Sequence, residues 1–222
     1  MPLEKSGKPE RPAKAEKADK ANKVDKAESR PYHHGDLRSA LLASAERTLR
    51  DKGTAALSLR ELARDIGVSH AAPGRHFKDK QALLNALALA GYERLAQTLN
   101  AADDPALPLQ PRLTALARAY LGFAVDNAAL LELMYARKHD PETADLFAAE
   151  VDRTVGSMHR LIADAQERGE IVEGDPETLA LFTGTLMHGL ATFTANGAVP
   201  PEAAMTLVED LVHHLLHGLK PR

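Results

Sequence analysis

The sequence predicts an all-α protein of about nine helices, with a small N-terminal part and a larger C-terminal part. Apolar residues recur at spacings of three and four in every long segment after Pro31, which is the period of an amphipathic helix. No segment alternates apolar and polar residues over the length of a strand. Candidate N-caps and terminating glycines lie at the edges of several of these segments and mark where helices begin and end.

Residues 1–31 are predicted to be a disordered, charged tail. From Glu4 to Glu28 the chain is mainly Lys, Ala, Glu and Asp, so it cannot bury enough apolar surface to offset the entropy cost of ordering. The net charge is +3 over residues 1–31, +3 over residues 32–80 and −9 over residues 81–222. This asymmetry favours a polyanionic partner for the N-terminal third. The tail itself is either a solvated leader or a basic arm that adds non-specific affinity for phosphates.

The first predicted helix carries one apolar stripe and stops at Gly53; the stripe consists of Leu37, Leu41, Leu42, Ala45 and Leu49. The second helix spans residues 59–66 and ends at Gly67. Its start is marked by Ser58-Leu59-Arg60-Glu61, a capping-box pattern in which the serine oxygen accepts a hydrogen bond from the amide three residues on.

A short third helix is predicted from Ser69 to Phe77, and a fourth, capped by Asp79, from Lys80 to about Asn100. Two helices separated by a tight break, the second of them short, have the spacing of a helix-turn-helix. A generic helical bundle is the alternative. Taken alone, Pro73-Gly74 predicts a turn, because proline lacks an amide and glycine is about 1 kcal/mol less favourable than alanine in a helix.

Three prolines within residues 101–111 interrupt the helical pattern and separate the N-terminal helices from the C-terminal ones. Five more helices are predicted, over residues 112–127, 128–138, 141–168, 176–195 and 201–218. Two of them begin with Asp-Pro-Glu, at Asp140 and Asp175, which places aspartate at the N-cap and proline in the first turn. We divide the chain into one domain over residues 32–82 and a second, helical domain over residues 83–222 that includes most of the fourth helix.

A helix-turn-helix inserts the exposed face of its short helix into the major groove of DNA. Ser58, Arg60, Tyr32 and Lys80 are placed to contact phosphates, and the N-termini of helices also favour anions. The complete set of expected DNA-binding residues is Tyr32, Ser58, Arg60, Ser69, His70, Ala71, Ala72, Gly74, Arg75, His76 and Lys80.

The run from Ser58 to Leu84 resembles the DNA-binding signature of the tetracycline-repressor (TetR) family of bacterial transcriptional regulators. The segments Tyr32-His33-His34-Gly35-Asp36-Leu37-Arg38 and Met187-His188-Gly189-Leu190 resemble a branch of that family whose C-terminal domain is named for a Trp-His-Gly motif. The resemblance implies an all-helical homodimer that binds a palindromic operator. It also implies a C-terminal domain that holds a small effector and changes the spacing of the two recognition helices.

Two positions depart from the family pattern. Gly74 stands where the family most often has a tyrosine that contacts the DNA backbone, and Met187 stands where the branch has tryptophan. We expect weaker operator binding than is usual in the family, or a substitute phosphate contact from Arg75 or His76.

Aromatic residues and methionines are the candidates for the effector cavity, because the chain has few aromatic residues and these fall on the C-terminal helices. Most residues of this kind at helical spacing belong to the core, which is the other interpretation. His188 could bond an effector or a neighbouring backbone group, and Gly189 could allow two helices to pack closely. The expected effector-binding residues are Tyr120, Phe123, Met134, Tyr135, Met158, Met187 and His188.

The last two predicted helices are expected to form the dimer through a four-helix contact. The final helix carries an apolar stripe that is wider than packing on one side requires; it consists of Leu207, Val208, Leu211, Leu215 and Leu216.

Other function classes have little support in the sequence. The absence of cysteine removes disulfides and thiolate zinc sites, and neither a signal peptide nor an apolar run of about 18 residues is present, so a cytoplasmic location is expected. His213, His214 and His217 could share a metal, but without a carboxylate partner the polar edge of a dimerising helix is the favoured interpretation. We expect no cofactor and no enzymatic activity, since no catalytic spacing stands out.

The function predicted from the sequence is that of a ligand-responsive regulator, a repressor released from its operator by a small molecule. The alternative is a helical dimer that binds a small molecule or a partner and whose DNA reader is weakened at Pro73-Gly74.

Overall fold

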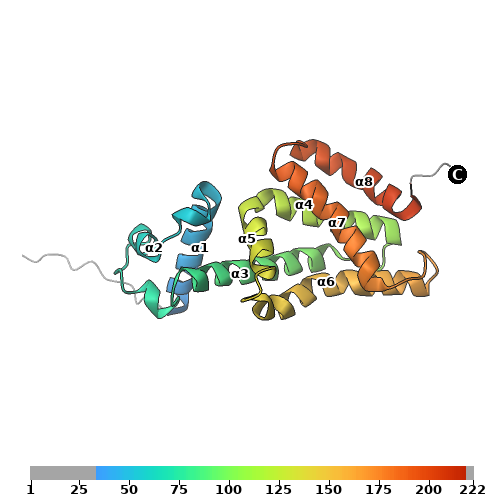
Figure 1. Ribbon diagram of the computed structural model, residues 1–222. Helices are drawn as coiled ribbons and strands as arrows, with labels where there is room; N and C mark the ends of the chain where they lie inside the picture. Colours follow the sequence, from blue (N-terminus) through green and yellow to red (C-terminus); the bar gives the residue numbers. More distant parts are fainter. Residues whose placement is uncertain (1–33, 219–222) are drawn as a thin grey trace, which may run out of the picture. The chain divides into compact units, whose positions relative to one another are not determined.

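The computed structural model describes residues 34–218, and this part of the chain contains eight α-helices, two short 3-10 helices and no strand. The predicted tail and Tyr32 lie outside the described residues. The α-helices, labelled in Figure 1, are α1 (His34–Lys52), α2 (Leu59–Asp65), α3 (Lys80–Ala102), α4 (Leu109–Asp126), α5 (Ala128–Lys138), α6 (Ala144–Glu167), α7 (Pro176–Ala195) and α8 (Pro201–His217). The 3-10 helices are η1 (Thr54–Ala56) and η2 (Pro73–Arg75).

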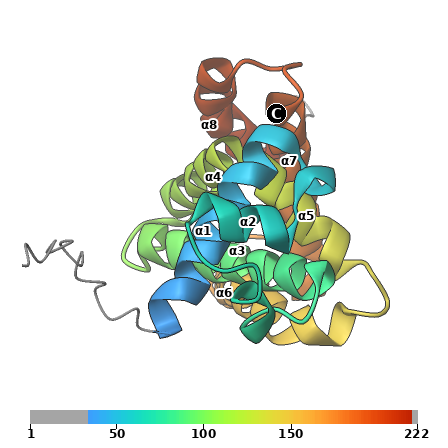
Figure 2. The same ribbon diagram turned by 90° about the vertical axis from the view of Figure 1, so that its left-hand side faces the viewer.

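Helices α1 and α2 and the start of α3 form the predicted N-terminal unit, which faces the viewer in Figure 2. The predicted apolar stripe of α1 is confirmed, because Leu37, Leu41, Ala45 and Leu49 are buried. Gly53 and Gly67 follow α1 and α2 with φ of 74° and 73°, a left-handed conformation that glycine adopts at little cost. Both helix ends were therefore predicted from the position of a glycine.

The predicted third helix is replaced by a turn followed by η2. Within it, the amide of Ala72 donates to Ser69 O, and the amides of His76 and Phe77 both donate to Pro73 O, each at 2.9 Å. Only the bond from Phe77 has the spacing of an α-helix. The prediction of a helix was wrong because Pro73 supplies no amide and Gly74 favours the helix least after proline. Pro73 is buried, so it anchors the segment to the core.

The capping box at the start of α2 was also predicted wrongly. Ser58 occupies the N-cap with an extended backbone, but its side chain caps no amide. Glu61 forms an ion pair with Arg64, one turn further along the exposed face, and does not reach back. By contrast, the N-caps at Asp79 and Asp175 are confirmed, because both carboxylates accept backbone amides of the first turn.

Helix α6 begins three residues later than predicted. The Asp140 carboxylate accepts the amide of Glu142, and the Thr143 hydroxyl donates to Arg137 O at the end of α5 at 2.7 Å. These bonds fold residues 140–143 into a turn, so the helix starts only at Ala144. Helix α4 starts earlier than predicted, at Leu109, because Pro111 is tolerated in its first turn.

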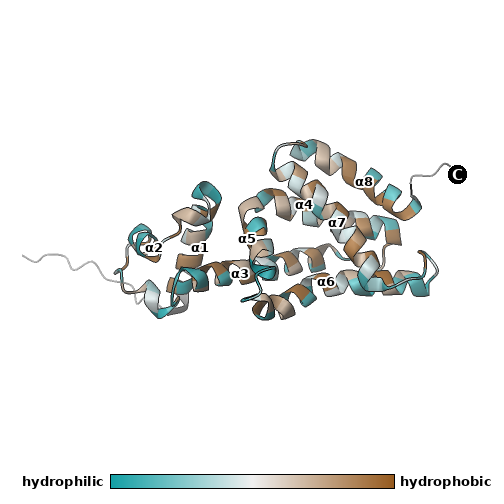
Figure 3. Cartoon of the chain, viewed as in Figure 1, coloured by the Kyte–Doolittle hydropathy of each residue, from teal (hydrophilic) through white to brown (hydrophobic). Residues whose placement is uncertain are grey.

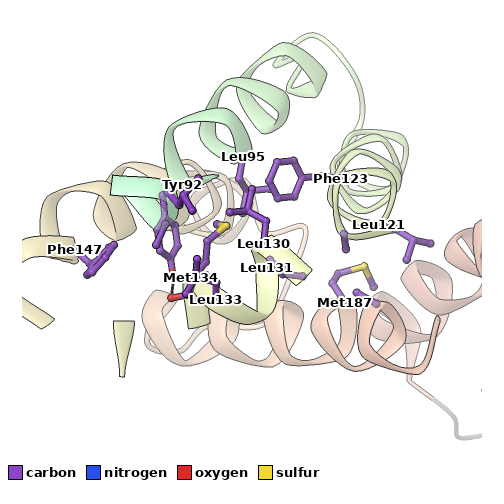
Figure 4. Packing of buried hydrophobic residues seen from close by; sticks show 14 of the residues in the cluster. Tyr92, Leu95, Leu121, Phe123, Leu130, Leu131, Leu133, Met134, Phe147 and Met187 are labelled. Carbon is purple, nitrogen blue, oxygen red and sulfur yellow. Dashed lines mark hydrogen bonds between the residues drawn. The ribbon is translucent and has the colours of Figure 1, made fainter. Parts of the chain in front are cut away.

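One core runs through the described residues, and hydrophobic residues, brown in Figure 3, occur on all of the helices. Helix α3 packs against α1 at its N-terminal end and against α4, α5 and α6 further along. Its closest approach is to α5 at Gly91, where an added Cβ would lie 2.6 Å from Met134 Sδ. Figure 4 shows Met134 buried beside Tyr92, whose hydroxyl donates to the Met134 carbonyl at 3.3 Å. No helix in the described range is both long and apolar enough to span a membrane.

Candidate nucleic-acid interface and ligand cavity

The segment between α2 and α3 presents five of the eleven predicted DNA-binding residues to solvent. Ser69, His70, Ala71, Gly74 and Arg75 are exposed. Arg75 has no ion-pair partner among the described residues, so its guanidinium is free to bond a base edge or a phosphate. Beneath this surface, Leu62, Ala63 and Phe77 are buried as predicted.

Five other predicted contacts occupy different settings. Arg60 is exposed on α2, whereas Ser58 and Ala72 are half-buried. Lys80 is half-buried and donates to Ala55 O at 3.2 Å, which holds it at the first turn of α3 with two ammonium protons still available. His76 is half-buried, and its Nε2 is buried without a hydrogen-bond partner, so that atom is not presented to DNA.

One cation beside this surface was missed by sequence reasoning. The exposed Arg38 of α1 lies over the ring of Phe77, with its Cζ 5.5 Å from the ring centroid. This position places a positive charge next to the turn that carries Arg75. Arg38 lies in the segment that resembles the family, but its contact with Phe77 could not be predicted from the sequence.

Two hydrogen-bonded pairs join the N-terminal unit to the helices behind it. Arg94 of α3 donates to the Glu46 carboxylate of α1 at 2.8 Å. Arg137 of α5 donates to Asn85 Oδ1 of α3 at 2.7 Å. Asn85 lies less than two turns from the start of α3, so this bond links α5 to the part of α3 next to the exposed turn.

A cavity of about 790 Å³ lies among the C-terminal helices, within the size range of small-molecule sites. Most of its wall is apolar and comes from α3, α4, α6 and α8, with Leu95, Leu113, Leu116 and Val212 among the buried contributors. Helices α5 and α7 complete the wall.

Three polar side chains meet in this cavity, one from each of α4, α5 and α7. Tyr120 Oη lies 2.9 Å from His188 Nδ1 and 3.5 Å from Tyr135 Oη. The rings of Tyr135 and His188 are stacked, with centroids 4.0 Å apart. We refer to Tyr120, Tyr135 and His188 as the polar triad.

The polar triad carries no formal charge at neutral pH. Burial lowers the pKa of His188, which keeps the imidazole neutral. Burial also raises the pKa of Tyr120, and the nearby Tyr135 hydroxyl adds to that increase. Nδ1 of His188 bonds Tyr120, and Nε2 makes no hydrogen bond within the described residues. Nε2 is therefore available to bond a ligand.

Five of the seven predicted effector-binding residues line this cavity; they are Tyr120, Tyr135, Met158, Met187 and His188. Phe123 and Met134 do not line it, because they are buried in the core, as Figure 4 shows. An effector contact by these two residues stays a prediction that this cavity does not support, since the identity of a residue does not reveal which face of its helix meets a cavity. Gly189 is not needed for close packing within the chain, because an added Cβ would meet no atom within 4 Å.

The lining includes three charged side chains, Lys138, Asp175 and Glu177. The Lys138 ammonium is 6.0 Å from the ring centroid of Tyr135. The Asp175 carboxylate is occupied by the first amides of α7 and by the Thr178 hydroxyl, and these hydrogen bonds lower its pKa. Within residues 34–218, no three His, Asp or Glu side chains are grouped so that they could hold a metal ion.

Two family models match the chain. Residues 41–87 match the model described as "Bacterial regulatory proteins, tetR family", and residues 113–219 match the model described as "Tetracyclin repressor-like, C-terminal domain". An HTH-type transcriptional regulator of Mycobacterium tuberculosis is 32% identical over 141 residues, which is 61% of this chain and 59% of the relative. The chain therefore spans less than two thirds of that mycobacterial relative. The regulator BetI of Rhizobium meliloti is 28% identical over 190 residues, covering 79% of this chain and 87% of BetI.

Solved structures show the same fold. A protein of unknown function from Rhodococcus sp. RHA1 is 40% identical, with a TM-score of 0.78, and the match covers 86% of this chain and all of that one. The TetR family transcriptional regulator PfmR from Thermus thermophilus matches with a TM-score of 0.68 and 21% identity over 83% of this chain and 98% of that one. The first model covers the exposed turn, and the second covers the cavity lining except for the residues from α3. The chain belongs to the tetR family of bacterial regulatory proteins.

Proposed function

We propose that the chain is a repressor that binds a palindromic operator as a homodimer and is released when a small molecule enters the cavity. The observation that carries the proposal is the pairing of an exposed turn, centred on Arg75, with a mainly apolar cavity on the same helical framework. A protein that binds bacterial DNA in this way would act in the cytoplasm. Its proposed role requires no catalysis.

The proposed division of DNA contacts follows the setting of each side chain. The exposed residues from Ser69 to Arg75 would face base edges, with Arg75 as the side chain able to form two hydrogen bonds to guanine. Arg60, Ser58, Lys80 and Arg38 would contact phosphates, which position the protein without reading sequence.

The proposed dimer surface is formed by α7 and α8, which pack on each other within the chain. Leu181, Phe182 and Phe193 of α7 are 66%, 58% and 57% exposed, an unusual setting for large apolar side chains. On α8, Leu207 is exposed, whereas Val208 is buried against its own chain. The other three residues of the predicted stripe, Leu211, Leu215 and Leu216, are half-buried, so the proposed interface would combine this part of α8 with the exposed side chains of α7.

Release from DNA would use the Arg137–Asn85 pair, which joins α5 to the first two turns of α3. Tyr135 contributes to the polar triad, and Arg137, two residues further along α5, holds Asn85 of α3. A ligand that favours a different position of α5 would shift α3 and change the distance between the two DNA-reading turns of the dimer.

A fluorescence anisotropy titration tests the proposal. The full chain is titrated onto labelled duplex from upstream of its own gene, at fixed salt, beside an unrelated duplex of equal length. We expect binding to the upstream duplex at least about 1,000-fold tighter than to the control, the lower end of specific recognition. Equal affinity for the two duplexes would contradict operator recognition at that region.

A second candidate function is favoured by one observation. The segment where a recognition helix is expected is a turn and a 3-10 helix, with its amide pattern broken at Pro73. A chain of this kind could bind a small molecule or a protein partner through its C-terminal helices and have lost tight DNA binding. The same titration separates the two candidates, because this one predicts weak, salt-sensitive binding to both duplexes.

A further inference from the structure

We infer that the cavity binds an uncharged, mainly apolar molecule with one hydrogen-bonding oxygen, such as a ketone or an ester, and that this oxygen is held by the polar triad. The inference rests on the proposed function, since it names the chemical class of the effector. It concerns the interior of the cavity and does not depend on the DNA contacts.

The cavity wall selects an apolar body. Most of its surface is apolar and includes leucines and methionines from α3, α4, α6 and α7, which offer dispersion contacts but no hydrogen bonds. A molecule covered in polar groups would lose its hydration here without compensation. The body of the effector is therefore hydrocarbon in character.

The polar triad selects a single neutral head group. When Tyr120 donates to His188 Nδ1, Nε2 carries the imidazole proton and is a donor. The Tyr135 hydroxyl contacts Tyr120 Oη only at 3.5 Å, so its proton can turn from Tyr120 to a ligand oxygen. His188 and Tyr135 both lie in the cavity lining, and their rings are stacked, so their positions are fixed relative to each other. Two fixed groups side by side match one acceptor oxygen.

A charged head group would be unfavourable at the triad. Burial keeps His188 neutral, so a carboxylate there would face no positive charge, and no carboxylate of the chain bonds the triad to receive an ammonium. Placing an ion in such surroundings without a partner costs more than its hydrogen bonds return. The competing possibility is a carboxylate drawn to Lys138, whose ammonium lies near the Tyr135 ring. That alternative is one outcome of the test.

The test compares three probes that share a ten-carbon body: 2-decanone, decanoate and decylammonium. Each is titrated by calorimetry into the full chain at about pH 8, where the last two are ionised. We expect 2-decanone to bind at least about tenfold tighter than either ion, the ratio that corresponds to one well-made hydrogen bond. Each probe is also added to the preformed operator complex, and 2-decanone is expected to release the DNA.

Two matched variants locate the head group. Tyr135→Phe removes the hydroxyl of the triad and is expected to weaken 2-decanone about tenfold while leaving both ions unaffected. Tyr92→Phe is the control, because Tyr92 also lines the cavity but its hydroxyl donates to the Met134 carbonyl. We expect Tyr92→Phe to bind 2-decanone as the parent chain does.

Each remaining result contradicts a defined part of the account. If decanoate or decylammonium binds as tightly as 2-decanone, or if Tyr135→Phe binds the ketone unchanged, the neutral head group is refuted while the effector cavity stands. If none of the three probes binds, the effector cavity of the proposed function is refuted along with the inference. Operator binding in the absence of any probe is measured separately and is untouched by either result.

Discussion

Replacing Gly74 by tyrosine should tighten operator binding, because the structure leaves room for a side chain at this position. Gly74 is exposed, and a Cβ built there would meet no atom within 4 Å. Its φ lies outside the left-handed region, so the backbone accepts a side chain without strain. The neighbouring Ala72 and His76 have right-handed helical backbones, which is the conformation that the new residue would favour.

The expected gain has two parts. Tyrosine is about 0.5 kcal/mol more favourable than glycine in a helix, which would order the turn around η2. A hydroxyl that reaches a phosphate adds about 1 kcal/mol. A dimer gains both contributions twice, about 3 kcal/mol in all, which corresponds to roughly 100-fold tighter binding.

Fluorescence anisotropy at fixed salt on one operator measures this change, with Gly74→Phe as the matched control. The phenylalanine variant retains the helix preference but lacks the hydroxyl, so it should bind only about fivefold tighter than the parent chain. Equal affinities for the two variants would refute the phosphate contact. Weaker binding by Gly74→Tyr would refute the whole argument and mean that DNA approaches the bare backbone at this position.

Three further predictions address recognition, assembly and packing. Arg75→Ala should weaken operator binding by about 1–3 kcal/mol and relax the choice of base at one position. Lys80→Ala should weaken binding to all DNA sequences alike and lower the salt dependence of log K by about one per contact; equal loss of specificity in both variants would contradict these roles. Phe182→Asp should yield a folded monomer by light scattering, because the exposed ring would be replaced by a charge that an apolar interface cannot accept, and a stable dimer would place the interface elsewhere. Gly91→Ala should lower the free energy of urea unfolding by about 1–3 kcal/mol through overpacking against α5, while Gly122→Ala, whose Cβ meets nothing within 4 Å, should not lower it.

Helix existence could be predicted from the sequence because each apolar stripe has a helical period, and the stripe on α1 is buried as expected. The caps at Asp79 and Asp175 were equally predictable, since a carboxylate there satisfies amides that no other group reaches. Where local preferences compete, prediction failed. At Pro73-Gly74 the family resemblance favoured a helix and propensity favoured a turn, and the structure agrees with propensity.

The cavity could be predicted only in part. Its existence was suggested by the aromatic residues of the C-terminal helices, but which side chains line it depends on the rotation of each helix in the bundle. Tyr135 and Met134 are adjacent in the sequence, yet the first lines the cavity and the second is buried against Gly91. The contact between Tyr120 and His188 joins residues 68 positions apart, and no local pattern encodes that separation.

The central claim is that two chains read one palindromic DNA site. Selection of bound duplexes from a random pool, followed by the mass of the complex with the enriched duplex in sedimentation, tests it most directly. The account predicts one enriched palindrome, with half-sites about one helical turn or a multiple of it apart, and an even number of chains on each duplex. A pool without an enriched sequence, or a single half-site bound by one chain, would contradict it.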